Sequence, residues 1–314
     1  MKAIVLDTDN QYRLTELDEP TPGPGQVAIR VGHVGVQWGD ALIRDGRFPV
    51  PRPFVAGFDV SGRIHAVGEG VDPGRIGERV AALATGGGYA ETVLVPTVLA
   101  LPSGGLSSAE AAGFGWGATT AYDLIHTVSR LAAGESVLIH AAAGGVGTAA
   151  AQFARLAGAG RIVGVVGSPS KVDYALRFGY DEVVPSSGFR DLLAGERFDV
   201  VLDSVGGRTS RASLDLLAGG GRLVAFGTAG GEEFSVPATE LTMANQAVLG
   251  YSSFTLSHTD PGRLADSARR ALALVVDGRV RLDITAEYEL ADVAAAVAAM
   301  ADRATVGRTV VRVA

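Results

Sequence analysis

The sequence predicts an α/β fold built around a doubly wound parallel sheet, and two observations predict it. In the stretch 136–147, an apolar run rich in β-branched residues ends in a turn of small residues, and an Ala-rich segment follows. Over residues 119–253, strand-like apolar runs alternate with helix-like segments. Within the first stretch, Ala142-x-Gly144-x-x-Gly147 is the dinucleotide-binding fingerprint with Ala in the first glycine place. We therefore expect a dinucleotide site at this turn, the alternative being a tight strand-to-helix turn that binds nothing.

The composition is that of a compact α/β protein long enough for two domains. The 314 residues are 47% hydrophobic and 19% charged, with 43 glycines and a net charge of -7. This acidic balance argues against nucleic acid or an anionic membrane as a partner. The chain has no cysteine, which removes disulfides, thiolate ligands and thiol nucleophiles. No stretch has the pattern of a signal peptide or a membrane span, so we expect a cytoplasmic protein.

Residues 1–118 are expected to form a β-rich unit. Turn-forming glycines and prolines separate its strands, which we place at 2–6, 26–34, 57–67, 79–83 and 89–95. A helix of small residues begins near Ser107.

The central part, 119–253, is expected to supply the parallel sheet. Its strands are placed at 137–140, 161–166, 181–184, 198–202, 221–226 and 247–251. The helical segments between them are placed at 148–157, 170–178, 188–194 and 208–218.

The last part of the chain is expected to rejoin the N-terminal unit. It reads as a helix over 263–277, a short strand near Ile284, a helix over 290–301 and a strand over 308–313. The predicted domains are therefore 1–118 with 254–314, and 119–253.

Several motifs, in this order and spacing, resemble those of the medium-chain dehydrogenase/reductase superfamily and, within it, the zinc-independent quinone oxidoreductase branch. They occupy residues 53–62, 67–68, 88–91, 120–121, 142–147, 203–207 and 307–311. The resemblance implies a GroES-like partial β-barrel catalytic domain, interrupted by a Rossmann NADPH-binding domain. It also implies an active site in the cleft between the two domains.

The chain departs from the zinc alcohol dehydrogenases of this superfamily. Where those enzymes have a Gly-His-Glu motif and two cysteines around the metal, this chain has Gly57-Phe58-Asp59 and no cysteine, and the segment 81–88 is too short for the structural zinc lobe. The five histidines, at 33, 65, 126, 140 and 258, lack ligand spacing. We therefore expect no metal. Without zinc to carry alkoxide charge, hydride transfer is favoured to a quinone, an enone or an α,β-unsaturated thioester, which delocalise that charge themselves.

The end of the second strand of the fingerprint unit favours NADPH over NADH. An NAD site usually has Asp or Glu there, but no carboxylate lies between Gly147 and Asp173. Ser168, Ser170 and Lys171 can instead supply donors and a cation to a 2′-phosphate, and relatives that use NADPH have Lys at this place. The alternative is that the serines cap a helix and Lys171 is solvated.

The resemblance implies further cofactor contacts. Arg308 matches a basic position near the phosphates in some relatives, although it could equally be a surface charge on the last strand. The other expected contacts are Thr120, Ala143, Gly144, Gly145, Val146, Gly147, Ser204, Val205, Gly206, Phe226 and Gly227.

On the substrate side, the segment from Gln37 to Arg44 faces the nicotinamide in relatives, many of which have Asn in place of Gln37. Trp38 can stack on a flat acceptor or donate its N–H to an oxyanion, and packing is the alternative. Asp40 and Arg44 are expected to pair along one helix turn. No residue is identified as the proton donor, which water can replace, so the catalytic candidates are Gln37, Trp38 and Tyr122. Expected apolar pocket walls are Trp38, Phe48, Trp116, Tyr251 and Phe254.

The predicted function is zinc-independent, NADPH-dependent reduction of a quinone or other conjugated enone. One alternative is an enoyl-thioester reductase of the same superfamily, and another is a non-catalytic NADPH-binding sensor or structural protein. We also expect a homodimer, formed through the strand near residues 247–251.

Overall fold

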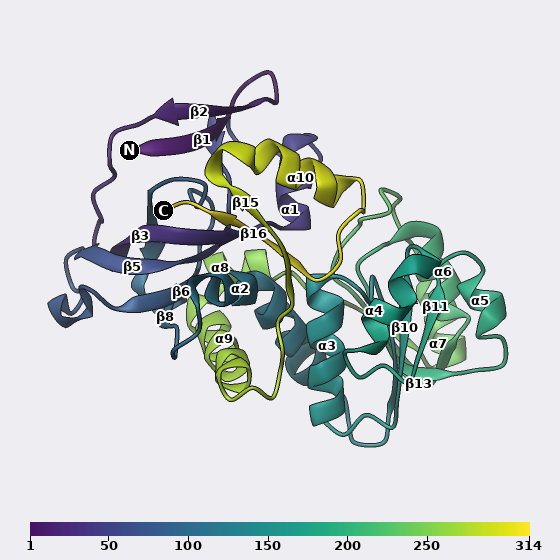
Figure 1. Ribbon diagram of the computed structural model, residues 1–314. Helices are drawn as coiled ribbons and strands as arrows, with labels where there is room; N and C mark the ends of the chain where they lie inside the picture. Colours follow the sequence, from purple (N-terminus) through teal and green to yellow (C-terminus); the bar gives the residue numbers. More distant parts are fainter. The chain divides into compact units, whose positions relative to one another are not determined.

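The computed structural model describes residues 1–314, and the chain divides into two compact units. Unit 1 comprises Met1–Thr119 and Phe254–Ala314, and unit 2 comprises Thr120–Ser253 (Figure 1). The predicted fold class is confirmed, because unit 1 is β-rich and unit 2 is built on a parallel sheet.

Unit 2 contains one six-stranded sheet in which all neighbouring strands are parallel. In sheet order, the strands are β11 (Glu182–Pro185), β10 (Arg161–Val166), β9 (Ser136–His140), β12 (Phe198–Asp203), β13 (Leu217–Ala225) and β14 (Ala247–Gly250). The chain runs outward from β9 in one direction and then returns to the other side of it. The carboxyl ends of β9 and β12 therefore form the switch point at which such sheets bind ligands.

Helices connect these strands across the two faces of the sheet. They are α3 (Gly145–Leu156), α4 (Val172–Leu176), α5 (Phe189–Leu192), α6 (Gly207–Leu214) and α7 (Ala238–Ala244). In Figure 1, α3 lies on one face and α5 and α6 lie on the other. Phe189 of α5 and Leu214 of α6 join a buried cluster with Leu138 and Val201 of the sheet, and burial of this apolar surface stabilises the layers.

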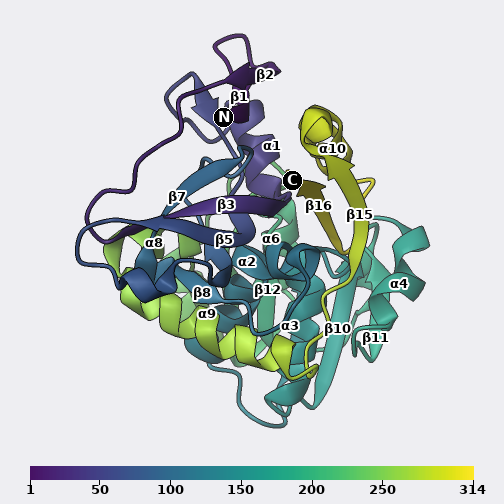
Figure 2. The ribbon, with the colours of Figure 1, turned by 60° about the vertical axis from the view of Figure 1, so that its left-hand side comes forward.

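Unit 1 contains a seven-stranded sheet and a smaller three-stranded one (Figure 2). The larger has the order β15 (Ile284–Glu289), β16 (Arg308–Arg312), β3 (Gln26–Gly35), β5 (Asp59–Val67), β6 (Arg79–Leu83) and β8 (Ala100–Pro102), with β7 (Thr92–Pro96) also paired to β3. The smaller has the order β2 (Tyr12–Glu16), β1 (Lys2–Leu6) and β4 (Phe54–Val55). The last two strands of the chain, β15 and β16, thus extend a sheet whose other strands lie within residues 26–102.

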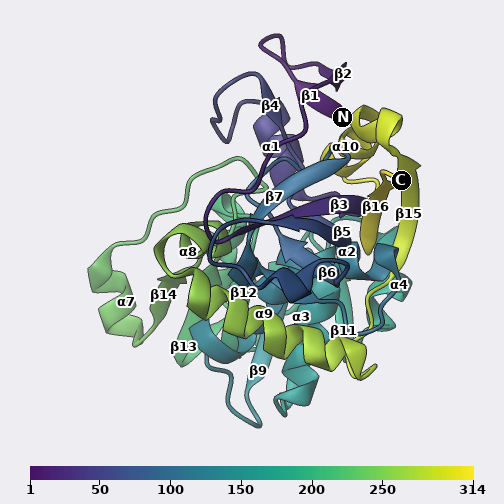
Figure 3. The same cartoon turned by 90° about the vertical axis from the view of Figure 1, so that its left-hand side faces the viewer.

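The helices of unit 1 come from both ends of the chain. They are α1 (Trp38–Arg44), most of α2 (Ser108–Asp123), α8 (Ser253–Thr259), α9 (Pro261–Val276) and α10 (Val293–Ala301). In Figure 3, α8 leads directly into α9. Asp260 begins α9, because its carboxylate accepts a hydrogen bond from the Arg263 N–H at 3.1 Å and Pro261 fixes the first turn.

The expected elements differ from the structure mainly in unit 1. The expected strand 89–95 begins at Thr92, because the preceding N–H groups of Gly87, Gly88 and Tyr89 bond to the carbonyls of residues 55–57. Strand β2 was not predicted, since its side chains are largely exposed and polar. No helix combines the length and the apolar character needed to cross a membrane.

Candidate functional site

In the turn after β9, the start of α3 packs closely against the backbone of the turn, as the small residues there predict. Gly144 precedes α3 in extended conformation, and α3 begins at Gly145. A Cβ on Gly147 would lie 2.5 Å from the carbonyl oxygen of Ala141, so any side chain there would separate helix from strand. The first N–H groups of α3 have no partner within the helix and lie with the positive end of its dipole at the turn. This turn can hold a pyrophosphate group.

The end of β10 also fits the phosphate site expected there. Ser168 begins a single 3₁₀ turn, Pro169–Lys171, and its hydroxyl lies 2.9 Å from that of Ser170. Ser170 is exposed and Lys171 is half-buried, so both remain accessible. The nearest acidic residue along the chain, Asp173, lies in the following helix α4. The hydroxyls of Ser168 and Ser170 and the ammonium group of Lys171 therefore lie in one turn that contains no carboxylate.

The loops after β12 and β13 hold one another in place. Asp203 is buried at the end of β12, and its carboxylate accepts from the N–H of Val205 at 2.7 Å and from Ser210. The carbonyls of Ser204 and Val205 accept from Ala229 and Gly230 at 2.9 and 2.8 Å. Residues 204–206 and 226–227, both expected cofactor contacts, thus lie in one bonded pair of loops at the carboxyl edge of the sheet.

Three other predicted residues of unit 2 have side-chain partners of their own. The hydroxyls of Thr120 and Ser253 lie 3.0 Å apart. Tyr122 packs edge-on against Phe153 of α3, with ring centroids 5.5 Å apart. Tyr251 donates a 2.6 Å hydrogen bond to the buried carboxylate of Asp123, which gives it a structural role besides the expected one as a pocket wall.

In unit 1, the start of α1 presents one buried donor without an acceptor. The indole Nε1 of Trp38 is shielded from solvent and has no hydrogen-bond partner, whereas the side chain of the preceding residue, Gln37, interacts with the buried carboxylate of Asp59. An unsatisfied buried donor costs about 1–3 kcal/mol. The indole N–H of Trp38 is therefore able to donate to an oxygen acceptor.

The buried carboxylate of Asp40 fixes this segment. Its Oδ2 accepts from the N–H of Gln37 at 2.8 Å and from the Tyr89 hydroxyl at 3.0 Å, and its Oδ1 accepts from the N–H of Gly57 at 3.2 Å. Burial raises the pKa of Asp40 to about 7, although these hydrogen bonds favour the ionised form. The expected pair with Arg44 is wrong, since the Arg44 guanidinium bonds to Asp45 instead at 2.8 Å.

Three of the expected pocket walls form an aromatic group within unit 1. Phe254 meets Phe48 edge-on at 5.4 Å between ring centroids and lies 6.4 Å from Trp116. Phe48 is 39% exposed, whereas Trp116 is buried with its indole N–H directed at the carbonyls of Phe58 and Ala84. Trp116 is therefore a core residue, and Phe48 with Phe254 remain candidates for the apolar wall.

Arg308 does not have the surroundings expected of a phosphate ligand. It is buried in unit 1 and forms an ion pair with Asp59, which is itself fully buried and also accepts from the N–H of Trp116. Gly115 allows this arrangement, since a Cβ there would lie 1.9 Å from the Asp59 carboxylate. Burial raises the pKa of Asp59, and the guanidinium opposes that rise. We therefore leave Arg308 out of the proposed cofactor site.

The histidines and carboxylates do not gather into a metal-binding group. No three side chains of His, Asp or Glu are placed together as ligands of one ion. His140 is a core residue, as expected: its Nε2 lies 2.8 Å from the Ser213 hydroxyl, and burial lowers its pKa.

The role of Asp40 was missed by sequence reasoning. Its Tyr89 partner lies 49 residues away, so no local spacing indicates the contact. One signal that could have indicated the importance of Tyr89 is its position in the segment 88–91, one of the motifs that resemble those of the family.

Comparison with known proteins identifies the family. Residues 23–104 match the family described as an alcohol dehydrogenase GroES-like domain, and residues 145–269 match the one described as a zinc-binding dehydrogenase. A quinone oxidoreductase of Pseudomonas aeruginosa is 35% identical over 92% of this chain and 91% of its own length. This chain belongs to the quinone oxidoreductase branch of the medium-chain dehydrogenase/reductase superfamily. It is therefore an oxidoreductase.

Two further proteins similar to this chain are described by their cofactor or by their function. The solved quinone oxidoreductase of Thermus thermophilus, described also in complex with NADPH, has a TM-score of 0.85 and 34% identity, with all of both chains covered. A mycocerosic acid synthase-like polyketide synthase of Mycobacterium tuberculosis is 32% identical over 94% of this chain, which spans only 14% of that protein.

Proposed function

We propose that this protein is a zinc-independent, NADPH-dependent oxidoreductase that delivers hydride to a quinone or another conjugated enone. The observation that carries the acceptor half is the buried, unpartnered donor Trp38 Nε1. Negative charge develops on the acceptor oxygen as a conjugated carbonyl is reduced, and fixed N–H donors stabilise that charge. Asp40 would act as a positioning residue, because it holds the N–H of Gln37 at the start of the helix that carries Trp38.

Several features of unit 2 support NADPH as the cofactor. The glycine turn at 144–147 leaves room for a pyrophosphate, and Ser168, Ser170 and Lys171 offer donors and a cation to the 2′-phosphate. The loops at 204–206 and 226–227 would lie against the nicotinamide half. When bound, NADPH supplies the hydride.

The zinc-free assignment rests on the donor set. Asp59, at the place of the ligand-bearing motif in zinc alcohol dehydrogenases, is committed to Arg308 and to the N–H of Trp116. The chain has no cysteine to replace it. Donors, and not a metal, would then stabilise the developing oxyanion.

The experiment is anaerobic NADPH consumption with a naphthoquinone, a 2-enone and crotonyl coenzyme A in parallel, each repeated with NADH. Rapid consumption with the quinone or the enone, and little with NADH, supports both the acceptor class and the cofactor. If NADPH binds but no acceptor is reduced, the proposal fails.

A second candidate is reduction of an enoyl thioester. It is favoured by the polyketide synthase relatives, which match nearly the whole of this chain. Clear preference for crotonyl coenzyme A over the quinone and the enone would select it.

We also propose that the protein is a homodimer formed through β14. This strand is at the edge of its sheet, with β13 as its one partner, and open edge strands pair readily with a second copy. Met243 of the preceding helix is 85% exposed, which is unusual for a large apolar side chain. A monomer mass by light scattering at micromolar concentration would contradict this proposal.

A further inference from the structure

Three arginines form one row across neighbouring strands of the larger sheet of unit 1. Arg30 of β3 is the direct partner of Arg63 in β5, and Arg63 is in turn the direct partner of Arg79 in β6. Directly opposed side chains of antiparallel strands share a face with their Cβ atoms about 5 Å apart, and like charges there are destabilising. The row therefore lowers stability wherever no negative charge offsets it.

A carboxylate neutralises the positive charge at only one end of the row. Arg30 forms an ion pair with Glu19 at 3.2 Å. Arg63 bonds to the carbonyl of Gly77 at 3.0 Å, Arg79 bonds to that of Leu106 at 2.7 Å, and neither forms an ion pair. A carbonyl accepts a hydrogen bond from one N–H group, but it does not neutralise the positive charge of the guanidinium group. Acidic residues exceed basic ones in this chain by seven, yet no Asp or Glu side chain pairs with Arg63 or Arg79.

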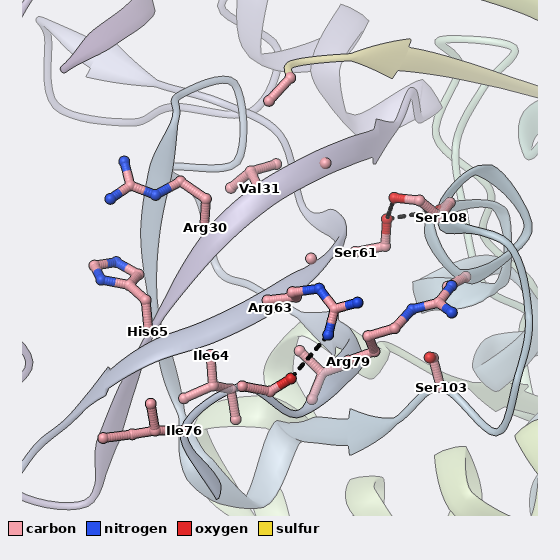
Figure 4. A pocket seen from close by; sticks show the side chains of 16 residues that line it. Arg30, Val31, Ser61, Arg63, Ile64, His65, Ile76, Arg79, Ser103 and Ser108 are labelled. Carbon is pink, nitrogen blue, oxygen red and sulfur yellow. Dashed lines mark hydrogen bonds between the residues drawn. The ribbon is translucent and has the colours of Figure 1, made fainter.

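The same three arginines line a pocket of about 580 Å³ (Figure 4). Its other polar side chains include the hydroxyls of Ser61, Ser103 and Ser108, and no Asp or Glu side chain lines it. Among its aliphatic lining residues, Ile76 is 52% exposed, whereas Val31, Ile64 and Val80 are each only 1% exposed. In Figure 4, Arg63 and Arg79 lie side by side near Ser61 and Ser108, while Arg30 and His65 lie toward the other end. The pocket thus combines a cationic end with an exposed aliphatic side chain, in the size range of small-molecule sites.

We propose that this pocket binds a small amphipathic anion, namely a carboxylate or phosphate monoester with a short apolar body. The guanidinium groups of Arg63 and Arg79 would take the anionic head in the forked geometry that suits carboxylates and phosphates. The Ser103 hydroxyl would add a donor, since those of Ser61 and Ser108 bond to each other and to the Ser108 carbonyl. The exposed side chain of Ile76 would contact the apolar body. All lining residues belong to unit 1, and none is among those proposed for the cofactor or the acceptor.

The test titrates the full chain by isothermal calorimetry with octanoate and octyl phosphate, and with octanol and inorganic phosphate as partial ligands. We expect both anions to bind, octanol not to bind, and phosphate to bind at least tenfold more weakly than octyl phosphate. Arg63→Gln and Arg79→Gln should each weaken octanoate at least tenfold. Arg269→Gln, at an exposed arginine paired with Asp266 on α9, is the matched control and should bind as the parent does.

Two further variants keep the result independent of folding defects. Ile76 lines the pocket and is 52% exposed, so Ile76→Glu should place a carboxylate beside the arginines and abolish octanoate binding, whereas Ile76→Gln should retain it. In the ligand-free protein, Arg63→Gln should raise the melting temperature at low salt, because it removes a like-charge contact.

Three results would overturn the proposal. One is that neither octanoate nor octyl phosphate binds at millimolar concentration, and another is that heparin binds while both of them fail. The third is that Arg63→Gln lowers the melting temperature and no anion binds. That would mean that the chain itself neutralises the arginine charges, for instance through the α-carboxylate of Ala314, which also lines the pocket.

Discussion

The hydroxyl of Tyr89 donates a 3.0 Å hydrogen bond to the carboxylate of Asp40 in the interior of unit 1. Both side chains are buried, and the same carboxylate holds the N–H of Gln37, where α1 begins. The contact therefore joins a turn near residue 89 to the segment that carries the unpartnered indole N–H of Trp38. It explains why a carboxyl group of raised pKa is retained in an apolar core.

The first prediction concerns the pH dependence of stability. The pKa of Asp40 is about 7 in the folded protein and near 3.8 when unfolded, so between these values the native state keeps a proton that the unfolded chain releases. The free energy of unfolding should therefore fall as pH rises from 4 to 7. Relative to Asp40→Asn, the parent should lose about 3 kcal/mol between pH 5 and pH 8 in urea unfolding.

The control for this measurement is Asp266→Asn, which removes an exposed carboxylate on α9. Its unfolding free energy should follow the parent at both pH values. Parallel pH curves for the parent and Asp40→Asn would show that the carboxyl of Asp40 titrates normally, contrary to this account.

The second prediction uses the two tryptophans of the chain. Trp38→Phe removes an indole N–H that has no partner, so kcat with the enone should fall about tenfold while the free energy of unfolding stays within about 1 kcal/mol of the parent. Trp116→Phe removes an N–H that serves two carbonyls, at 3.2 and 3.1 Å, so it should lower stability. Unchanged turnover in Trp38→Phe would remove Trp38 from the proposed acceptor site.

The third prediction uses the two lysines, Lys2 and Lys171. Lys171→Ala should weaken NADPH about tenfold or more and leave NADH nearly unchanged, because a charge-assisted hydrogen bond contributes roughly 1.5–3 kcal/mol. Lys2→Ala should alter neither dissociation constant. Bound NADPH should also protect Lys171, but not Lys2, from acylation. Equal losses of both cofactors in Lys171→Ala would contradict the 2′-phosphate assignment.

The fourth prediction separates a structural role of Arg308 from cofactor binding. Arg308→Met leaves Asp59 buried without its cation, which should cost about 3–5 kcal/mol of unfolding free energy. The double variant with Asp59→Asn should recover part of that loss, and folded Arg308→Met should bind NADPH as the parent does. A stable Arg308→Met with NADPH affinity reduced tenfold would restore Arg308 to the phosphate site.

The sheet of unit 2 could be predicted closely from the sequence. Its strands are short apolar runs between small or polar residues, and β10 has the predicted bounds, 161–166. The glycine turn could be predicted too, since close packing at Gly147 restricts which residue fits. These features are local, so one segment contains the whole signal.

The interior of unit 1 could not be predicted in the same way. Asp40 and Arg44 have helical pair spacing, yet Asp40 is buried because residues 57 and 89 supply its donors. Arg308 begins a strand whose first four residues are all buried, so alternation does not reveal which way it faces. Its partner Asp59 is 249 residues away. Such contacts depend on which distant strands become neighbours.

The most direct test of hydride transfer is an isotope experiment with NADPH deuterated at the transferring position of C4 and 2-cyclohexenone as the acceptor, run anaerobically. We expect saturated cyclohexanone that contains one deuterium, located at C3, by mass spectrometry and NMR. Cyclohexanone without deuterium, or NADPH oxidation without formation of cyclohexanone, would contradict hydride transfer from NADPH to a conjugated acceptor.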